Sequence, residues 1–405
     1  MDALGNAARA LRGFDPLEAL RHVALRSDPS ALALRGIAMA QLGEFATARA
    51  LLTRAAKAFG GGAPVARARC VVARAEIALA CRDLGDAERD LDAAANVLEA
   101  RGDVENALFA RLQSVRRLVL LGELRAAERA LTALELRRAP PLLVTVAELA
   151  AVDIAVRSVR ARDARLAVER ARAAARAAAV PSLTAEVEQA ARTLEANVAR
   201  LRVAGAESAV RLDQVEDIFR SSELVVDACR REVRSEKVVI PLVARPVLLS
   251  LAVALAESSP AEATREALAR RAFGAKAVTE SVRARLRVEI GRLRRVIAPI
   301  ADVRATLLGF SLVPRRGKRV LLLLPPDPGE SSAVLALLGG EPSWSTSGLA
   351  KALGKSQRTV QRALGLLLSE GRVEAVGKGP ARRWMATAPT SFATTMLLLF
   401  RDSLD

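Results

Sequence analysis

Side chains that support catalysis and metal binding are scarce in this chain of 405 residues. It has one histidine, His22, and three cysteines, Cys70, Cys81 and Cys229, with no CxxC or CxH spacing. A structural zinc site needs about four His or Cys ligands close together, so we expect no such site in this chain. A Ser/His or Cys/His pair would have to use His22, whose surroundings (LEALRHVALR) read as an ordinary amphipathic helix. Neither GxxxxGK[ST] nor GxGxxG occurs, so we expect no metal, no cofactor and no enzymatic activity.

Segments that would direct the chain to a membrane are also missing. The first residues, MDALGNAARALRG, lack the apolar core of a signal peptide. Every long apolar stretch is interrupted by Arg or Glu within 18 residues, so no transmembrane span is expected. We therefore expect a cytoplasmic, nucleoid-associated protein with reduced thiols and no membrane contact.

Positive charge is abundant and unevenly placed. Lys and Arg number 62 against 45 Asp and Glu, a formal net charge of +17. Residues 245–383 hold 24 basic and 11 acidic side chains, whereas the rest of the chain is nearly balanced, with 38 and 34. An arginine-rich genome is the alternative explanation, but it would spread the charge evenly. The clustering favours a polyanionic partner.

The first half has the composition of a helical protein. Residues 1–203 are rich in Ala, Leu, Arg and Glu, with prolines only at the joints, at Pro16, Pro29, Pro64, Pro140, Pro141 and Pro181. Strong helix formers between such breaks predict helical hairpins. In SALALRGIAMAQLGEFATARALLTRAAKAF, small and apolar residues fall at repeated spacings, at Gly36, Gly43, Ala48, Leu52 and Ala55. Small residues there allow two antiparallel helices to approach closely, with Gly43 closing the turn.

The spacing recurs around Gly122, Ala127, Leu131 and Leu134, and more weakly around Gly85 and around Ala167, Ala171 and Ala174. This pattern resembles the tetratricopeptide (TPR) family over about residues 15–203, without the family's aromatic positions. The resemblance implies a stack of α-hairpins with a concave groove. We expect the groove to bind a peptide, a protein or a second subunit. The alternative is a scaffold or dimerisation spacer with no separate ligand.

The second half changes in composition after about residue 205. The segment LVVDACRREVRSEKVVIPL (224–242) predicts short strands, and helices are predicted at 245–258, 262–273 and 279–299. The last of these opens at a cap region and stops at Pro299. The segment VRATLLGFSLVPRRGKRVLLLL (303–324) then predicts a β-hairpin.

This order resembles the winged-helix DNA-binding domain of OmpR/PhoB-class response regulators over about residues 220–325. The resemblance is carried by VVIPL, by EIGRLRRVI (289–297) and by LLGFSLVP (307–314), where Phe310 stands at the position of the wing tyrosine. SARP-type antibiotic regulators combine the same class of domain with a TPR-like module, in the reverse order along the chain. The resemblance implies DNA binding. No segment resembles a phosphoacceptor receiver domain, so control by aspartyl phosphorylation is not implied.

The helix predicted at 279–299 combines an apolar stripe with basic faces. The residues that repeat at helical spacing are Val282, Leu286, Ile290, Leu293 and Ile297. Arginine is the commonest side chain to contact guanine in a major groove, and cations on a hairpin suit phosphates. The candidate DNA contacts are therefore Arg283, Arg285, Arg287, Arg292 and Arg294 on the helix, and Arg315, Arg316, Lys318 and Arg319 at the hairpin. The alternative is a core helix with a solvated cationic face.

Residues 330–386 predict a further unit. ESSAVLALLGGE predicts a short helix, and STSGLAKALGKSQRTVQRALGLLLSEGRV predicts two helices joined at Gly354 and ending at Gly371. Two such helices with a glycine in the turn are the helix-turn-helix signature. The packed faces would come from Leu349, Ala352, Leu353, Val360, Leu364, Leu367 and Leu368. EAVGKGPARRWMAT then predicts a β-wing.

This unit resembles a second winged helix, of the general MarR/GntR-like kind. Polar side chains at the start of the second helix would read the groove, and the wing would contact phosphates. The candidates are Ser356, Gln357, Arg358, Gln361 and Arg362 on the helix, and Lys378, Arg382 and Arg383 on the wing. The alternative is a structural helical hairpin. The apolar tail PTSFATTMLLLFRDSLD is expected to pack on this unit, or else to bind a partner.

Together these patterns predict a mainly α protein with small β wings. We expect a TPR-like domain at residues 1–205, an OmpR/PhoB-like winged helix at 206–326 and a second winged helix at 327–405. The expected function is that of a bacterial-type transcriptional regulator that binds specific double-stranded DNA as a homodimer, with affinity that falls steeply with salt. The alternative is an interaction adaptor whose winged helices bind protein.

Overall fold

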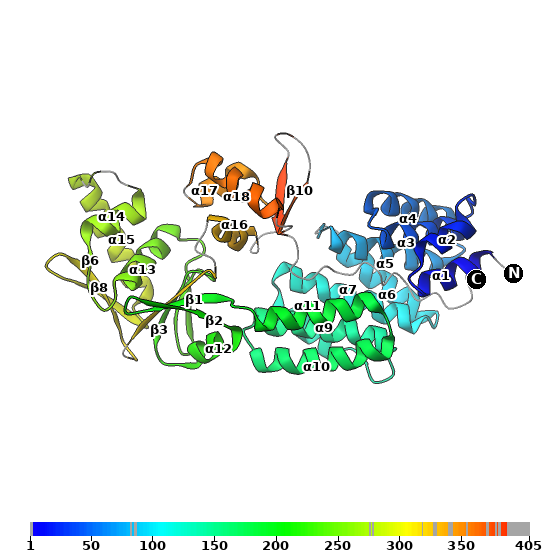
Figure 1. Ribbon diagram of the computed structural model, residues 1–405, viewed down its shortest axis with the longest axis horizontal. Coiled ribbons are helices and arrows are strands. Elements are labelled where there is room, and N and C mark those ends of the chain that lie inside the picture. Colours follow the sequence, from blue (N-terminus) through cyan, green and yellow to red (C-terminus); the bar gives the residue numbers. More distant parts are fainter. Residues whose placement is uncertain are drawn as a thin grey trace.

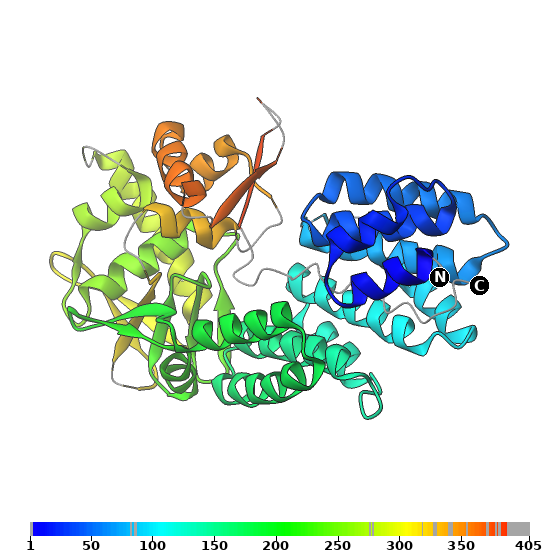
Figure 2. The same cartoon turned by 45° about the vertical axis from the view of Figure 1, so that its right-hand side comes forward.

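The computed structural model describes residues 3–81, 83, 84, 87–274, 277, 279–317, 319–326, 330–338, 343–353, 355–369, 372–376, 379 and 382–386. The chain is mainly α, with 64% helix. A stack of paired helices occupies one side of the molecule, a mixed α/β region the other, and the last helices lie beside that region (Figure 1). Figure 2 shows the same arrangement from a second direction. Every helix in the described residues is too short or too polar to cross a membrane.

The helical stack confirms the predicted hairpins. Its helices are α1 (Ala3–Arg12), α2 (Pro16–Val23), α3 (Pro29–Gln41), α4 (Phe45–Phe59), α5 (Pro64–Ala80), α6 (Ala87–Ala100), α7 (Val104–Leu121), α8 (Leu124–Thr132), α9 (Pro141–Arg157), α10 (Ala161–Ala178) and α11 (Pro181–Glu195). Five of them begin at a proline, whose fixed φ suits the first helical position. Gly36 allows α3 and α4 to touch, because a Cβ there would lie 2.8 Å from Cγ of Leu52.

A polar cluster is buried where α5, α7 and α11 meet. Arg116 Nη2 donates to Glu186 Oε1 at 3.2 Å, and both side chains are about 95% buried. Glu76 and Gln113 are also buried, and neither carboxyl oxygen of Glu76 has a hydrogen-bond partner among the described residues. Burial raises the pKa of the Glu76 carboxyl to about 8; the Arg116 guanidinium opposes this shift and the Glu186 carboxylate adds to it.

A six-stranded sheet begins directly after the stack. Its order is β2-β1-β9-β3-β4-β5, with β3 and β9 parallel and the other pairs antiparallel. The strands are β1 (Ala199–Val203), β2 (Ala206–Val210), β3 (Leu224–Asp227), β4 (Glu232–Ser235), β5 (Val238–Pro241) and β9 (Val320–Leu324), with α12 (Leu212–Arg220) between β2 and β3. Residues 199–203 are therefore a strand, where the composition predicted helix. Their alternation, ARLRV, lets β1 pair with both β2 and β9.

The predicted helices of the second half are confirmed as a helical core closed by a small sheet. We call this the central unit: α13 (Pro246–Ser258), β6 (Ala263–Thr264), α14 (Arg265–Phe273), α15 (Glu280–Ile297), β7 (Ala301–Ala305) and β8 (Gly309–Pro314). The order of its sheet is β6-β8-β7. The hairpin predicted over residues 303–324 is formed by β7 and β8 alone, because β9 belongs to the six-stranded sheet. Gly309 lets β6 pair closely with β8, because a Cβ at this position would lie 1.8 Å from the carbonyl oxygen of Ala263 in β6.

The last described elements form what we call the C-terminal unit. It consists of α16 (Glu330–Leu338), α17 (Thr346–Leu353), α18 (Gln357–Ser369), β10 (Val373–Val376) and β11 (Arg383–Ala386). Trp344 pairs with Trp384 as an isolated bridge, which adds a third segment to the hairpin. Its own core includes Val334, Leu349, Leu364 and Trp384. Gly354, Gly371 and the tail from residue 387 lie outside the described residues.

Candidate functional site

Helix α15 carries the predicted apolar stripe on one face. Leu286, Ile290, Leu293 and Ile297 are buried in the core of the central unit, and Val282 packs against them partly exposed. Thr279 caps the N-terminus of the helix, because its Oγ1 accepts a hydrogen bond from the backbone N–H of Val282 at 3.4 Å. The opposite faces of the helix are therefore left to solvent and bear its arginines.

Three of the predicted arginines project into solvent. The side chains of Arg283, Arg287 and Arg292 are 50%, 66% and 62% exposed. Their acidic neighbours lie on the same surface, with Arg292 Nη1 at 2.8 Å from Oε1 of Glu289 and Arg287 bonded to Glu280. The exposed Arg287–Glu280 pair contributes little to stability, so this arginine can exchange partners at small cost, whereas Glu289 is only 14% exposed.

The other two predicted arginines of α15, Arg285 and Arg294, contact other parts of the protein. Arg294 donates from Nε and Nη2 to the carbonyl oxygen of Val303 at 2.9 and 2.6 Å, which ties α15 to β7. The guanidinium of Arg285 lies 4.4 Å from the ring centroid of Phe273 on α14. Arg294 also lies 3.8 Å from Asp302, so these cation–π, backbone and ionic contacts fix the orientation of both guanidinium groups.

The cations predicted at the hairpin lie at its far end. β7 and β8 pair with Ala305 opposite Phe310 and Ala301 opposite Pro314, so the turn is residues 306–308. The segment after β8 lies at the other end of the hairpin, about 17 Å from this turn, because each strand residue adds about 3.3 Å. There Arg316 lies 3.1 Å from Glu236 and Arg319 3.0 Å from Glu223, while Arg315 is exposed. Lys318 lies outside the described residues. The structure does not bring this segment to the turn.

Two arginines that sequence reasoning missed extend the basic surface of α15. A groove of about 510 Å³ runs between the start of α13 and the second half of α15. Arg245, Arg292 and Arg295 line it with one acidic residue, Glu289. Arg295 follows Arg294 in the sequence and lies opposite the apolar stripe, so the helical period alone would have found it. Arg245 precedes α13, and only the packing of α13 on α15 brings it here.

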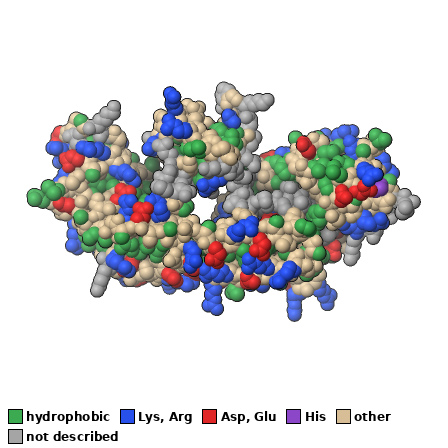
Figure 3. All heavy atoms as spheres, viewed as in Figure 1, with side chains coloured by type: hydrophobic (Ala, Val, Ile, Leu, Met, Phe, Trp, Pro, Cys, Tyr) green, Lys and Arg blue, Asp and Glu red, His purple; other side chains and the backbone are tan. Residues whose placement is uncertain are grey.

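The C-terminal unit presents a second polar groove. It has a volume of about 660 Å³ and lies between the start of α17, the exposed side of α18 and the hairpin. The lining residues are Ser345, Thr346, Ser347, Gln357, Gln361, Gly365, Leu368, Gly379, Arg382 and Trp384, none of them acidic. Lys and Arg side chains are visible over the same body in Figure 3.

Specific contacts shape this groove. Trp384 Nε1 donates to Thr346 Oγ1 at 2.9 Å, and Arg382 lies 4.6 Å from the centroid of the Trp384 ring. Ser356 caps α18, its Oγ accepting from the N–H of Thr359 at 3.1 Å. The remaining candidates on described residues, namely Arg358, Arg362 and Arg383, are exposed, and Lys378 lies outside the described residues. Of the candidate residues of α18, Gln357 and Gln361 thus line the same groove as Arg382 of the hairpin.

Glycines sit on the solvent side of both helices. A Cβ at Gly291 of α15 or at Gly365 of α18 would have no heavy atom within 4 Å. Glycine inside a helix costs about 0.5–1 kcal/mol relative to alanine, and no packing requires it at these positions. Such a surface lets another molecule approach the helix backbone closely.

Gly291→Ala is expected to raise the free energy of unfolding by about 0.5–1 kcal/mol, because the added methyl meets open space and favours the helix. Urea unfolding followed by circular dichroism measures this. The matched control is Gly36→Ala in α3, which should destabilise because its Cβ would clash with Leu52. Equal effects at the two positions would contradict this account of Gly291.

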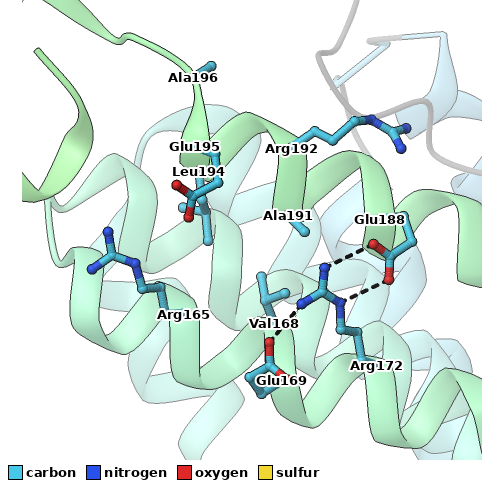
Figure 4. Close-up of a pocket in the computed structure, with 10 residues that line it drawn as sticks. All are labelled: Arg165, Val168, Glu169, Arg172, Glu188, Ala191, Arg192, Leu194, Glu195 and Ala196. Carbon is cyan, nitrogen blue, oxygen red and sulfur yellow. Dashed lines mark hydrogen bonds and ion pairs between the residues drawn. The ribbon is translucent and has the colours of Figure 1, made fainter.

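A further groove lies at the end of the helical stack, between α10 and α11 (Figure 4). Its volume is about 620 Å³, and its charges are paired within it. Arg172 bonds to Glu188 at 2.9 Å and to Glu169 at 2.7 Å, and Arg165 bonds to Asp213 of α12 at 2.7 Å. These pairs brace the last hairpin against the sheet region and leave the groove close to neutral.

The chain's thiols and carboxylates do not assemble into a metal centre within the described residues, where no three His, Cys, Asp or Glu side chains converge. Burial raises the pKa of the Cys70 and Cys229 thiols to about 12. Both therefore stay protonated at neutral pH, and a thiol is a much weaker nucleophile and ligand than a thiolate.

Comparisons with known proteins found no relative of this chain. No protein-family model, no curated protein and no solved structure matches the chain.

Proposed function

We propose that this protein is a transcriptional regulator that binds specific double-stranded DNA through two winged-helix units. The central unit supplies α15 and the C-terminal unit supplies α18 as recognition helices. The single observation that carries the proposal is the repetition of one arrangement: in each unit a helix buries an apolar stripe against two others and exposes arginines beside a β-hairpin. An α-helix of this kind fits a major groove, where arginine reads guanine.

Charge and its environment support nucleic acid over protein as the partner. Arg283 and Arg287 on α15 pair with exposed glutamates and Arg292 with the partly buried Glu289, and none of the described residues that line the groove of the C-terminal unit is acidic. Protein interfaces are enriched in arginine but also in aromatic residues and Met, whereas phosphate contacts need cations together with polar hydroxyl or amide groups. Gln357 and Gln361 supply such amides beside Arg382.

The helical stack has a different chemistry and, we propose, a different role. Its buried polar cluster and internally paired grooves suit a rigid scaffold, and its concave side suits a protein, a peptide or a second copy of the chain. TPR-like stacking of this kind would place the two DNA-binding units of a homodimer at a fixed spacing.

Selection of genomic fragments by the purified full-length chain at about physiological salt tests the proposal. One enriched motif is expected, with binding that weakens as salt rises. If six to ten phosphates are contacted, the slope of log K against log salt should be roughly −5 to −9. Recovery of fragments without a shared motif would contradict sequence-specific binding.

Arg358→Ala with Arg362→Ala is expected to shorten the footprint on the selected site by one half-site, because both side chains are exposed on α18. Footprinting at matched fractional occupancy measures this. The control variant replaces Arg101 and Arg125, exposed arginines of the helical stack, and removes the same charge. An unchanged footprint in the α18 variant would exclude α18 as a recognition helix.

A further inference from the structure

The turn between β7 and β8 presents two adjacent leucines to solvent. Leu307 is 92% exposed and Leu308 is 58% exposed. Each would gain from burial, and no described segment of the chain covers them. The turn therefore offers an apolar tip, with Arg304 two residues before it.

The tip is held rigidly by one arginine. Arg265 at the start of α14 donates from Nη1 to the Leu307 carbonyl oxygen at 2.9 Å and from Nη2 to that of Thr306 at 3.1 Å. Its backbone N–H donates to the Leu308 carbonyl oxygen at 3.3 Å. Thr306 Oγ1 also accepts from the N–H of Gly309 at 3.0 Å. A braced turn loses little conformational entropy when its side chains are buried by a partner.

The same hairpin is fixed to α15. The two bonds from Arg294 to the Val303 carbonyl oxygen join helix and strand, so the tip and the helix move together. Five residues of β7 place the tip about 17 Å from the end of α15. Half a turn of a duplex, which separates a major groove from the next minor groove, is also about 17 Å.

The charge around the tip favours DNA as its partner. Arg304 beside the turn is 65% exposed and lies 3.9 Å from Asp302, and the guanidinium of Arg265 is bonded to the turn itself, so cations outnumber carboxylates close to the tip. A partner that complements these leucines and arginines would offer an apolar cavity with negatively charged groups on either side. A base step of a duplex, with phosphates on either side, has this chemistry, and apolar side chains are known to enter such steps from the minor groove and bend the duplex.

We propose that Leu307 and Leu308 form a wedge that enters a base step from the minor groove and bends the bound DNA. This rests on the proposed function, because it requires α15 to lie in the neighbouring major groove. Flexible pyrimidine–purine steps open most easily, so the wedge adds a preference for such a step at a position that α15 does not touch.

The test compares full-length wild type with Leu307→Ser/Leu308→Ser on the selected duplex. Bending is measured by energy transfer between dyes on the two ends, and affinity by fluorescence anisotropy across a salt series. The wild type should bend the duplex by roughly 20–90°. The serine variant should lose the bend and roughly 10- to 100-fold in affinity, with the salt slope unchanged because no phosphate contact is removed.

Two controls separate the wedge from other effects. Leu17→Ser/Leu25→Ser removes two exposed leucines from the helical stack and should change neither bend nor affinity. Leu307→Met/Leu308→Met keeps the tip apolar and should keep the bend. A straight duplex in a specific wild-type complex, or an unchanged bend in the serine variant, overturns the wedge alone. A wild-type chain that binds no duplex overturns the proposed function, and the wedge with it.

Discussion

Replacing Arg283, Arg287 and Arg292 with alanine is expected to abolish the sequence-specific complex at moderate salt while the fold stays intact. All three side chains are at least half exposed. Each arginine that reads a base is worth about 1–3 kcal/mol of discrimination, so the triple variant should lose at least about 100-fold in specific affinity. Competition between the selected duplex and an unrelated one, measured by anisotropy, gives this ratio directly.

The fold should tolerate these changes because Glu280 and Glu266, the partners of Arg283 and Arg287, are exposed, and exposed pairs contribute about 0–1 kcal/mol. Glu289, the partner of Arg292, is only 14% exposed, but Arg245 and Arg295 line the same groove and remain in the variant. The matched control replaces Arg54, Arg101 and Arg125 of the helical stack, which are also exposed, and removes the same net charge. Equal loss in both variants would show that total charge, and not α15, governs binding.

The helical stack is expected to lose stability as pH rises from about 5 to 8, and Glu76→Gln should remove that loss. The folded state holds the Glu76 proton up to a pKa of about 8, whereas the ordinary pKa of this carboxyl is 4.5. Unfolding between these values therefore releases a proton, so a higher pH favours the unfolded chain. The slope is about 1.4 kcal/mol per pH unit for one proton.

The glutamine variant keeps the shape of the side chain but carries no charge at any pH. It should match the wild type near pH 5 and exceed it by about 3 kcal/mol near pH 8, as measured by denaturant unfolding at a series of pH values. The groups that face Glu76, namely Arg116 and Glu186, are unchanged in the variant. Glu123→Gln, at an exposed position, is the control. A wild-type pH slope retained by Glu76→Gln would contradict a buried, protonated carboxyl.

Local patterns predicted much of the fold because they reflect interactions within a few residues. Prolines mark the first residue of α2, α3, α5, α9 and α11, since proline suits that position and no later one in a helix. The helical spacing of Leu286, Ile290 and Leu293 predicts the buried face of α15 without knowledge of the elements that pack on it, and all three side chains are buried. The exposed Gln and Arg set of α18 follows from the same rule. The predicted DNA contacts themselves remain to be measured.

Contacts between distant segments were beyond such reasoning. The sequence 199–203 reads equally as the end of a helical region, and it becomes a strand because β9, more than 100 residues later, pairs with it. The cations after β8 were expected at a hairpin over residues 303–324, but β9 pairs with β1 and β3 instead of β8, and Arg316 and Arg319 lie beside Glu236 and Glu223. Arg245 joins Arg292 and Arg295 only because α13 packs on α15.

By itself, then, the sequence determined most of the helical segments, though not α12, and showed where several of them begin and which faces are apolar or basic, because propensity and periodicity act over one or two turns. The tertiary structure alone decided the order of the six-stranded sheet, the burial of Glu76 beside Arg116 and Glu186, and the clamp of Arg265 on the turn that exposes Leu307 and Leu308. These features join residues that lie far apart in the chain, and only the packing of whole elements brings such residues within contact distance.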